Sequence, residues 1–310
     1  MQNLPNPAGH GVRRHSQASA RMRSVAIAAL SFSALAVTTA TAYAEASTAP
    51  AECAALQAKY PQFKGKALVN AINPHTPGYE TIDPKDPSKY IGFDIDLGET
   101  IGACLGFTLS YKAVTFAALL TTLQSGQADI VISDIYATEE RAKAADFITY
   151  YKVFDGVLVA KGNPKKITGI NVSLCGTVAA ENTGYVEVPL IQALNPQCKA
   201  LGKPEPVIQL YDNNQNCIQA ILAGRADKYI NDINTVDAAV KAFPDKLEKA
   251  ASVNIPYSVG IAVPKGKPDF RDAVMAALVL LQKAGIHTAL LKKNGLPVEN
   301  LEAPRLLVAK

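Results

Sequence analysis

Short apolar runs of strand length alternate along the chain with segments whose apolar residues recur every three or four positions. The runs that predict buried strands in the first half lie at 67–73, 108–114 and 128–135. Segment 92–107 has the apolar spacing of a half-buried helix, and 116–126 predicts a second helix that ends at a glycine. Residues 74–89 are rich in turn formers, so we expect a loop there. A short helix is expected within 45–66.

The same alternation restarts after the Gly-Asn-Pro turn that ends segment 155–164. Further strands are predicted at 155–160, 177–181, 206–211, 228–232 and 257–266. Helices are predicted from about Thr183, over 214–227, and as a closing pair within 268–295.

Alternating strands and helices predict an α/β fold in which mostly parallel sheets are covered by helices on both faces. Two such units, each about 100 residues long, suggest two lobes with a cleft between them. Ligands of open α/β sheets bind beyond the carboxyl ends of strands. The strand tips at Ser133, Glu181 and Asp232 are therefore where we expect a binding site.

The first 44 residues have the pattern of a secretory signal. Arginines end at Arg23, an apolar stretch of small residues follows, and "AYA" precedes Glu45 as an A-x-A cleavage site. A spanning helix would need about 20 strongly apolar residues. We therefore assign 1–44 as a signal peptide and expect a soluble periplasmic product.

Charge excludes one class of partner. The chain has a formal net charge of +4, but the first 44 residues hold four arginines and no acid. Taking these four from the 31 basic residues leaves 27, which equals the 27 acidic residues. A neutral body lacks the basic face that nucleic-acid phosphates require, so we expect no nucleic-acid partner.

The five cysteines all lie in the exported part, where disulfides form. They are Cys53, Cys104, Cys175, Cys198 and Cys217. We favour a bridge between Cys175 and Cys198, which bracket a short strand and helix. A Cys53–Cys104 bridge is the second candidate, against the alternative that Cys104 is a small buried apolar residue. The odd number leaves one thiol over, and the spacings match no zinc site.

Five sequence motifs occur in order along the exported chain. They are "GFDIDL", "LLTTLQSGQADIVIS", "TEERAKAADFITYY", "AGRADKYINDINT" and "VGIAVPKG". Together they resemble the family 3 periplasmic solute-binding proteins, the amino-acid receptors of ABC importers, from about Ala67 to Gly295. The resemblance implies the type II periplasmic-binding-protein fold, with two mixed, mostly parallel sheets joined by a two-strand hinge. It places lobe 1 at 45–154 and 258–310, and lobe 2 at 155–257.

Arg141 is the first candidate for ligand binding. The resemblance to the family's T-x-x-R element, here Thr138 to Arg141, implies that this arginine holds the ligand's α-carboxylate and that Thr138 lies in the site. A planar guanidinium matches a carboxylate with two hydrogen bonds and stays charged in a closed cleft. The alternative is a surface arginine that pairs with Glu139 or Glu140.

Asp232, at the tip of "KYIND", is implied by the family to face the ligand's α-ammonium from the second lobe. A carboxylate buried without a partner is costly, so such a site requires a cation. The alternative is a capping role for the helix that follows, since aspartate is a favoured N-cap. The two roles are compatible.

Six further positions are implied by the family to line the ligand site. Thr183, Gly184 and Tyr185 match a strand-to-helix turn that offers N–H groups, although the family often has Gly-Thr-Thr or Gly-Ser where this chain has Thr-Gly-Tyr. The alternative is a plain capping role. Phe116 matches an aromatic or bulky position that packs on the ligand side chain, against a core role.

The "PGYE" loop resembles the family's "PPFE" loop and adds Tyr79, with Thr76 just before it. Its aromatic residue could instead only fill the loop. Asp134 and Tyr136 stand where relatives usually carry Gly, Ser or Thr. Asp134 would act with Asp232 or meet a second cationic group on the ligand, and Tyr136 would shrink or polarise the pocket. The alternative is that both side chains turn away from the cleft.

These features predict a receptor that binds an amino acid or amino-acid-like ligand without chemistry, with no cofactor and no metal. The hinge is expected near 151–157 and 255–260, so that closure makes the bound state recognisable to an inner-membrane permease. We expect a monomer. The alternative is a periplasmic enzyme on the same fold, such as a cyclohexadienyl or arogenate dehydratase-like lyase, with Asp134 or Glu181 as acid or base. A sensor domain is a third possibility.

Overall fold

The computed structural model describes residues 51–309. The signal peptide expected over 1–44 therefore lies outside the described residues. The described strands are β1 (Ala67–Ile72), β2 (His75–Thr76), β3 (Glu80–Asp83), β4 (Asp86–Ile91), β5 (Thr108–Ala113), β6 (Ile130–Val131), β7 (Tyr136–Ala137), β8 (Ala145–Ala160), β9 (Val178–Asn182), β10 (Val207–Tyr211), β11 (Lys228–Asp232), β12 (Leu247–Pro264) and β13 (Leu301–Leu307). The described α-helices are α1 (Ala51–Lys59), α2 (Phe93–Leu105), α3 (Leu119–Gln124), α4 (Glu139–Ala142), α5 (Glu187–Gln192), α6 (Asn195–Ala200), α7 (Asn214–Leu222), α8 (Ile233–Ala242), α9 (Pro268–Lys283) and α10 (Ile286–Lys293). Four short 3-10 turns complete them: η1 (Pro61–Phe63), η2 (Phe116–Ala118), η3 (Val172–Leu174) and η4 (Val298–Asn300).

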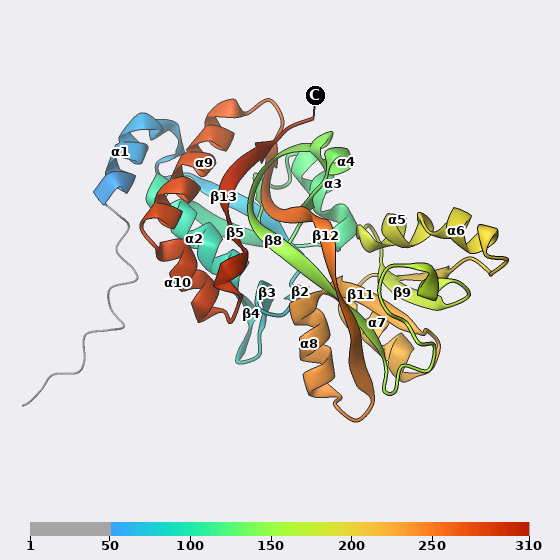
Figure 1. Ribbon diagram of the computed structural model, residues 1–310. Helices are drawn as coiled ribbons and strands as arrows, with labels where there is room; N and C mark the ends of the chain where they lie inside the picture. Colours follow the sequence, from blue (N-terminus) through green and yellow to red (C-terminus); the bar gives the residue numbers. More distant parts are fainter. Residues whose placement is uncertain (1–50, 310) are drawn as a thin grey trace, which may run out of the picture. The chain divides into compact units, whose positions relative to one another are not determined.

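Two groups of strands are joined through the long strands β8 and β12 (Figure 1). The hydrogen-bonded order is β10-β9-β11-β8-β12-β6-β1-β5, with β13 on β8 and β7 on β12. The pairs β1–β5, β1–β6 and β9–β10 are parallel, whereas β8 is antiparallel to β11 and β12. The predicted α/β class with two lobes is confirmed. The two expected sheets form one continuous ladder because β8 and β12 run through both.

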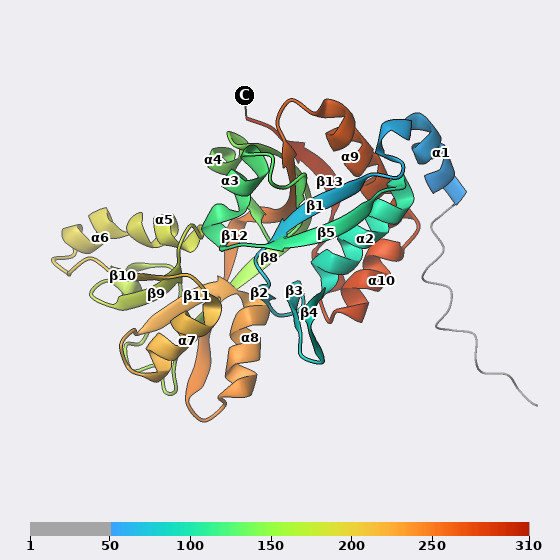
Figure 2. The same ribbon diagram turned by 180° about the vertical axis from the view of Figure 1, so that it is seen from behind.

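Lobe 1 is packed on both faces of its strands, as the alternation of apolar side chains requires. On β8, Ile148 belongs to the cluster formed with α2, α9 and α10, whereas the adjacent Phe147 belongs to the cluster formed with α3. On β6, Val131 also packs on the α3 side and Ile130 on the other side. Figure 2 shows β1 and β5 from behind, with α2 and α10 beside them.

Lobe 2 repeats this arrangement around β9, β11 and the end of β8. Leu158 and Tyr229 pack with residues of α7 and α8. Val157 and Ile230, their sequence neighbours on the same two strands, pack with residues of α5 and α6 on the opposite face. Period-two alternation therefore fixes which helices cover each face.

The two groups of strands are connected by β8 and β12. β8 pairs with β12 along most of its length, but the register shifts between Asn254 and Ser258 and again between Val259 and Gly260. The ladder is interrupted there because Pro256 cannot donate a backbone hydrogen bond. The irregular segment lies within the predicted hinge.

Three local predictions were wrong. The expected loop at 74–89 contains β2, β3 and β4, which form a small antiparallel sheet. The helix expected from about Thr183 begins at Glu187, because residues 183–186 form a turn first. The strand β13 was not predicted. Its sequence contains Pro304 and mixes polar with apolar residues, so it lacks the pattern of a strand, and it forms one by pairing with β8.

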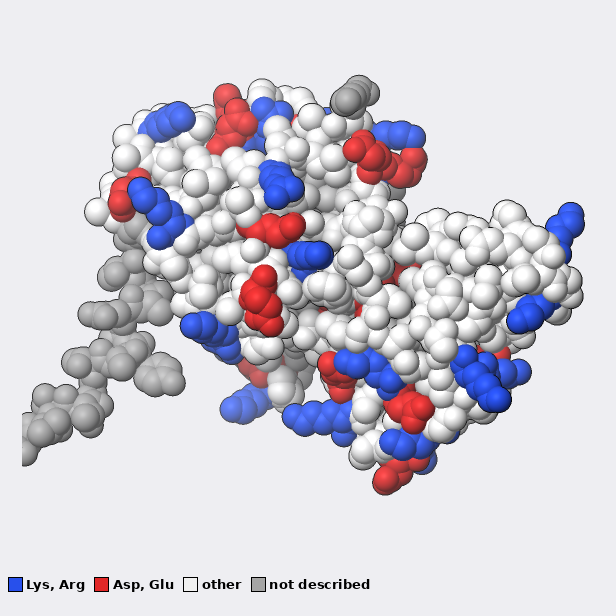
Figure 3. All heavy atoms as spheres, viewed as in Figure 1, with Lys and Arg blue, Asp and Glu red and all other residues white. Residues whose placement is uncertain are grey.

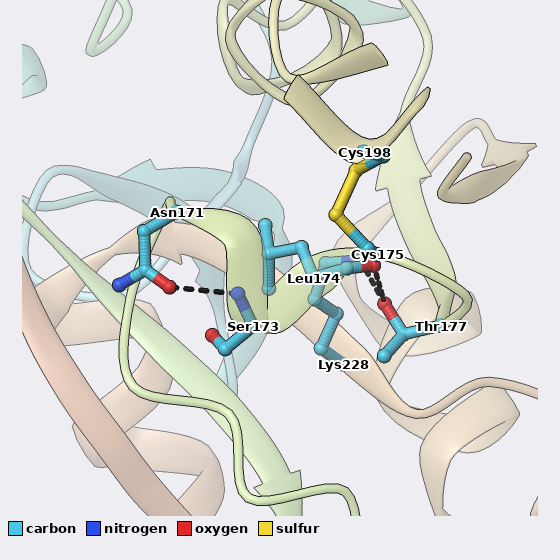
Figure 4. The surroundings of a disulfide bond; sticks show 7 residues. All are labelled: Asn171, Ser173, Leu174, Cys175, Thr177, Cys198 and Lys228. Atoms are coloured by element: carbon cyan, nitrogen blue, oxygen red, sulfur yellow. Dashed lines mark hydrogen bonds between the residues drawn. A yellow bond between two sulfur atoms is a disulfide. The ribbon is translucent and has the colours of Figure 1, made fainter. Parts of the chain in front are cut away.

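Both candidate disulfides are present. Cys175 is bonded to Cys198, and Cys53 is bonded to Cys104, so α1 is joined to α2. Cys217 is free and buried. Figure 4 shows the first bridge between η3 and α6.

The surface carries charges of both signs without a dominant field on the face seen in Figure 3. Within residues 51–309, no single helix is long and apolar enough to cross a membrane. The helices α9 and α10 meet both criteria only when they are taken together, and the pair is bent by 79°. The described residues contain no group of three or more His, Cys, Asp or Glu side chains that could hold a metal ion.

Candidate functional site

A small cavity lies where the ends of β7 and β11 approach the start of α5. It is lined by Phe116, Asp134, Tyr136, Arg141, Tyr185, Val186, Glu187 and Asn231. Its volume is about 10 Å³, which is room for a single water molecule. Residues from both lobes line it, so the structure is closed around this point. A larger groove of about 640 Å³ adjoins it, and Arg141, Tyr185 and Val186 line both.

Arg141 is held by the turn that begins α4. The Thr138 hydroxyl caps this helix by accepting a hydrogen bond from the Arg141 backbone N–H, at 3.1 Å. The guanidinium donates to the Tyr136 carbonyl at 2.7 Å and to the Gly184 carbonyl of the other lobe at 2.9 Å. It also lies 5.0 Å from the centre of the Phe116 ring, a cation–π contact.

The surface alternative for Arg141 does not fit this geometry. Among the ion pairs of the described residues, none joins Arg141 to Glu139 or Glu140, and Glu140 pairs with Lys143 instead. Burial lowers the pKa of Arg141, although a guanidinium stays protonated at neutral pH. The side chain lies at the boundary between the lobes.

Asp134 is buried, lines the cavity and has a strained backbone. Its φ of 37° lies in the left-handed region, which aspartate tolerates better than most residues. The Asp94 carboxylate fixes this turn by accepting from the Asp134 N–H at 2.6 Å. One Asp134 oxygen, Oδ1, is buried without a hydrogen-bond partner. Burial raises the pKa of Asp134 well above its ordinary value, and Asp232 adds to the shift.

Tyr136 also faces the cavity, so neither it nor Asp134 turns away from the cleft. Its hydroxyl donates to Oδ1 of Asp155 at 3.3 Å, and its carbonyl accepts from Arg141. Tyr136 therefore links Asp155 of β8 to Arg141.

Asp232 acts as the N-cap of α8. Its Oδ1 accepts from the backbone N–H and the side-chain amide of Asn234, at 2.8 and 2.9 Å. It is 1% exposed and is not among the residues that line the cavity, where its neighbour Asn231 stands. Burial raises the pKa of Asp232 to about 6. The capping role is observed, and the ligand role stays a prediction.

The turn at Thr183 to Tyr185 is only partly available to a ligand. The Thr183 N–H donates to the Tyr211 carbonyl at 2.9 Å, and its hydroxyl donates to the same oxygen at 3.4 Å. Gly184 has φ of 83°, and a Cβ there would lie 3.3 Å from Ala117. Tyr185 lines the cavity, where its ring centre lies 4.2 Å from that of Phe116. Phe116 and Tyr185 thus form an aromatic wall across the lobes.

Tyr79 and Thr76 are buried, but neither lines the cavity. Tyr79 packs edge-on against Phe93 and Tyr151, and its hydroxyl has no partner. Thr76 pairs with Glu80 in the small sheet. Their ligand roles stay predictions.

Asp155, Glu187 and Asn231 are not among the residues that the sequence motifs indicate. Glu187 and Asn231 line the cavity, and Asp155 receives the Tyr136 hydroxyl. One signal was available, since Asp155 interrupts the apolar run "YYKVFDGVLVA" and Glu187 stands among apolar residues in "YVEVPLI". An acid in a segment of that kind is seldom buried without a partner.

Buried carboxyls around the site lie close to one another. Burial and the Glu187 carboxylate raise the pKa of Asp155 well above its ordinary value. Burial and Asp94 raise the pKa of Glu80 in the same way. Glu181 instead faces Lys228, whose pKa burial lowers to about 8.

Comparison with known proteins identifies the family of this chain. The family model of the bacterial extracellular solute-binding proteins, family 3, matches residues 68–296. The arginine-binding protein ArgT of Corynebacterium glutamicum is 26% identical over 244 residues, which cover 78% of this chain and 79% of ArgT. The L-cystine-binding protein TcyJ of Escherichia coli is 28% identical over 211 residues, 67% of this chain and 75% of TcyJ.

Solved structures agree. An ancestral arginine-binding protein bound to arginine superimposes with a TM-score of 0.67 at 27% identity, covering 74% of this chain and 98% of the other. An ancestral amino acid-binding protein, described as a precursor of cyclohexadienyl dehydratase, shares the fold with a TM-score of 0.60 at 24% identity.

Proposed function

The chain belongs to the bacterial extracellular solute-binding proteins of family 3, and we propose that it is a periplasmic receptor which binds an amino acid between its lobes and delivers it to an ABC importer. Relatives named for arginine and L-cystine binding support an amino-acid ligand. The partner is then the inner-membrane permease, and the receptor acts as a monomer with lobe 1 at 45–154 and 258–310 and lobe 2 at 155–257.

The single observation that carries this proposal is the position of Arg141. Its guanidinium bridges the lobes through two backbone carbonyls at the edge of the cavity. A ligand carboxylate would be a stronger acceptor than either carbonyl, because its bonds to the guanidinium are charge-assisted on both sides. When the lobes reopen and a ligand enters, the Arg141 guanidinium therefore releases these carbonyls and binds the α-carboxylate. Asp232 or Asp134 binds the α-ammonium.

Thermal melting with single amino acids tests the proposal. A bound ligand at 100 times its Kd adds about 2.7 kcal/mol to the free energy of unfolding and raises Tm. Arg141→Ala should abolish the rise for every amino acid, since loss of one partner of a buried charge pair costs about 2–5 kcal/mol. Arg225→Ala, which alters an exposed arginine, is the matched control and should keep the rise.

An unchanged Tm rise in Arg141→Ala would refute the carboxylate role. Recovery of the ligand chemically intact after prolonged incubation is the second measurement. A turned-over ligand would identify the enzyme alternative, for which the buried carboxyls would supply the acid and base.

A further inference from the structure

The cavity holds more acidic groups than its one cation can balance. Asp134 and Glu187 line it together with Arg141, and Asp155 is near enough to Glu187 for the two carboxyls to affect each other's pKa. Asp134 is 8% exposed, Glu187 1% and Asp155 0%, so water cannot compensate their charges. Arg141 makes no salt bridge with any of them among the described ion pairs, since its fork is directed at two carbonyls.

Asp134 has an oxygen free for a ligand. Its Oδ1 is buried without a partner, although the residue lines the cavity and the backbone is held there in a left-handed turn. A carboxylate kept in a strained turn with one oxygen unpaired is costly unless a donor arrives from outside the chain. That donor has to be in the cavity.

The Asp155–Glu187 pair is the second acidic group. Oδ2 of Asp155 and Oε2 of Glu187 receive no donor from the described residues. Burial and the nearby Glu187 carboxylate raise the pKa of Asp155. A ligand cation at the Glu187 side of the cavity can pair with these oxygens.

Glu80 and Glu181 also keep one unpartnered oxygen each, but both lie off the cavity lining and contact polar groups of the protein. Glu80 bonds to Asp94 and accepts from the Ser133 hydroxyl at 3.0 Å. Glu181 faces Lys228, whose ammonium donates to Thr177 at 3.0 Å, deep in lobe 2 beside the Cys175–Cys198 bridge (Figure 4). Asp134 and Glu187 are therefore the acids with an unpartnered oxygen that line the cavity itself.

We propose that the ligand carries a second positive charge on its side chain, and that Glu187, paired with Asp155, is the group that receives it. This inference rests on the proposed function, in which Arg141 balances the α-carboxylate and Asp134 with Asp232 balances the α-ammonium. The Asp155–Glu187 pair is then left for another cation. The ligand class is a basic amino acid such as arginine, lysine or ornithine. The aromatic wall of Phe116 and Tyr185 suits such a side chain, because aromatic faces attract cations.

Calorimetric titration of the refolded, ligand-free protein with matched ligands tests the charge. Arginine is compared with citrulline, which has nearly the same shape without the charge, and lysine with Nε-acetyllysine. At least one basic amino acid should bind about 100-fold more tightly than its neutral counterpart, as expected for a buried carboxylate that loses its cation. A ratio below about tenfold for both pairs overturns the inference.

Glu187→Gln assigns the residue. It keeps the size of the side chain and removes the charge, so the basic-to-neutral affinity ratio should fall at least about tenfold. Glu140→Gln, which removes an exposed acid from the helix that carries Arg141, is the matched control and should keep the ratio. A Glu187→Gln protein that folds and keeps the full ratio overturns the assignment; if it does not fold, the wild-type ratios alone decide.

Failure of the inference differs from failure of the proposed function. If neutral amino acids bind as tightly as basic ones, the proposed second positive charge on the ligand is refuted, and the role of Arg141 is unaffected. Agmatine, which keeps the guanidinium of arginine but lacks its carboxylate, should bind at least about tenfold more weakly than arginine. Equal binding of agmatine would instead refute the role of Arg141 and leave the cation site standing.

Discussion

Asp134 combines a backbone that few residues tolerate with a carboxyl that the protein leaves unpaired. Asparagine also tolerates the left-handed region, so Asp134→Asn keeps the turn and removes the charge. Without ligand, we expect this variant to melt at a higher temperature, since its repulsion with Asp232 is gone. With ligand, the rise in Tm should be smaller than in the wild type. An unchanged ligand-induced rise would show that Asp134 does not bind the ammonium.

His287 gives a prediction for stability in acid. It is fully buried between Phe93 and Tyr150, and neither ring nitrogen has a partner. Burial lowers the pKa of His287 to about 4 from its ordinary 6.5. The unfolded chain therefore binds a proton before the folded one, and stability is lost as the pH falls from about 6.5 towards 4.

Denaturant melts of wild type and His287→Phe at several pH values measure this effect. Between pH 7 and pH 5 the wild type should lose about 2 kcal/mol more than the variant. The contribution of the buried carboxyls cancels when the pH dependence of the unfolding free energy is compared between the two proteins, because these carboxyls titrate in both. Parallel pH profiles would show that His287 is not the titrating group.

At the scale of elements, the contact between β8 and α8 depends on Gly156. A Cβ at this position would lie 2.8 Å from Cβ of Val236 on α8. Gly156→Ala should therefore destabilise the protein by about 1–3 kcal/mol through overpacking. Adding Val236→Ala should restore part of the loss, and urea unfolding of the two single variants and the double variant measures the coupling. Purely additive losses would contradict direct contact.

The Cys175–Cys198 bridge joins η3 to α6 across a separation of 23 residues. Closing a loop of this size in the unfolded chain is worth about 3 kcal/mol. The Cys175→Ala/Cys198→Ala protein should lose roughly that amount in urea unfolding and should keep its ligand affinity, because neither residue lines the cavity. Loss of ligand affinity in a folded variant would instead link the bridge to the site.

At the scale of the whole molecule, ligand binding and pH are linked. A cation that reaches Asp232 lowers the pKa of this carboxyl from its unliganded value of about 6, so binding releases a proton below that pH. The affinity for a basic amino acid should therefore be about tenfold weaker at pH 5 than at pH 7.5. Titrations at the two pH values test this; an affinity that is equal or higher in acid would contradict a cation at Asp232.

The alternation of apolar positions by itself determined the two-lobed α/β fold of this protein. Strands alternate with period two, and each helix that covers the sheet carries a stripe of apolar residues at helical spacing. The motif order indicated the family, and the resemblance to that family singled out Arg141, Asp134 and Tyr136. Local signals failed at β13, which is a strand only through pairing with the distant β8, and in the small sheet of β2 to β4, where turn-forming residues hide short strands that pair with their neighbours.

Only the tertiary structure decided which side chains meet in the cavity. Asp155, Glu187 and Asn231 come from three separate segments, and no local pattern indicates that they converge. The same holds for Tyr79 and Thr76, which packing buries away from the cavity lining. Sequence periodicity specifies the face on which a residue lies. Proximity across a cleft depends on how the lobes close, which is set by contacts between residues far apart in the chain.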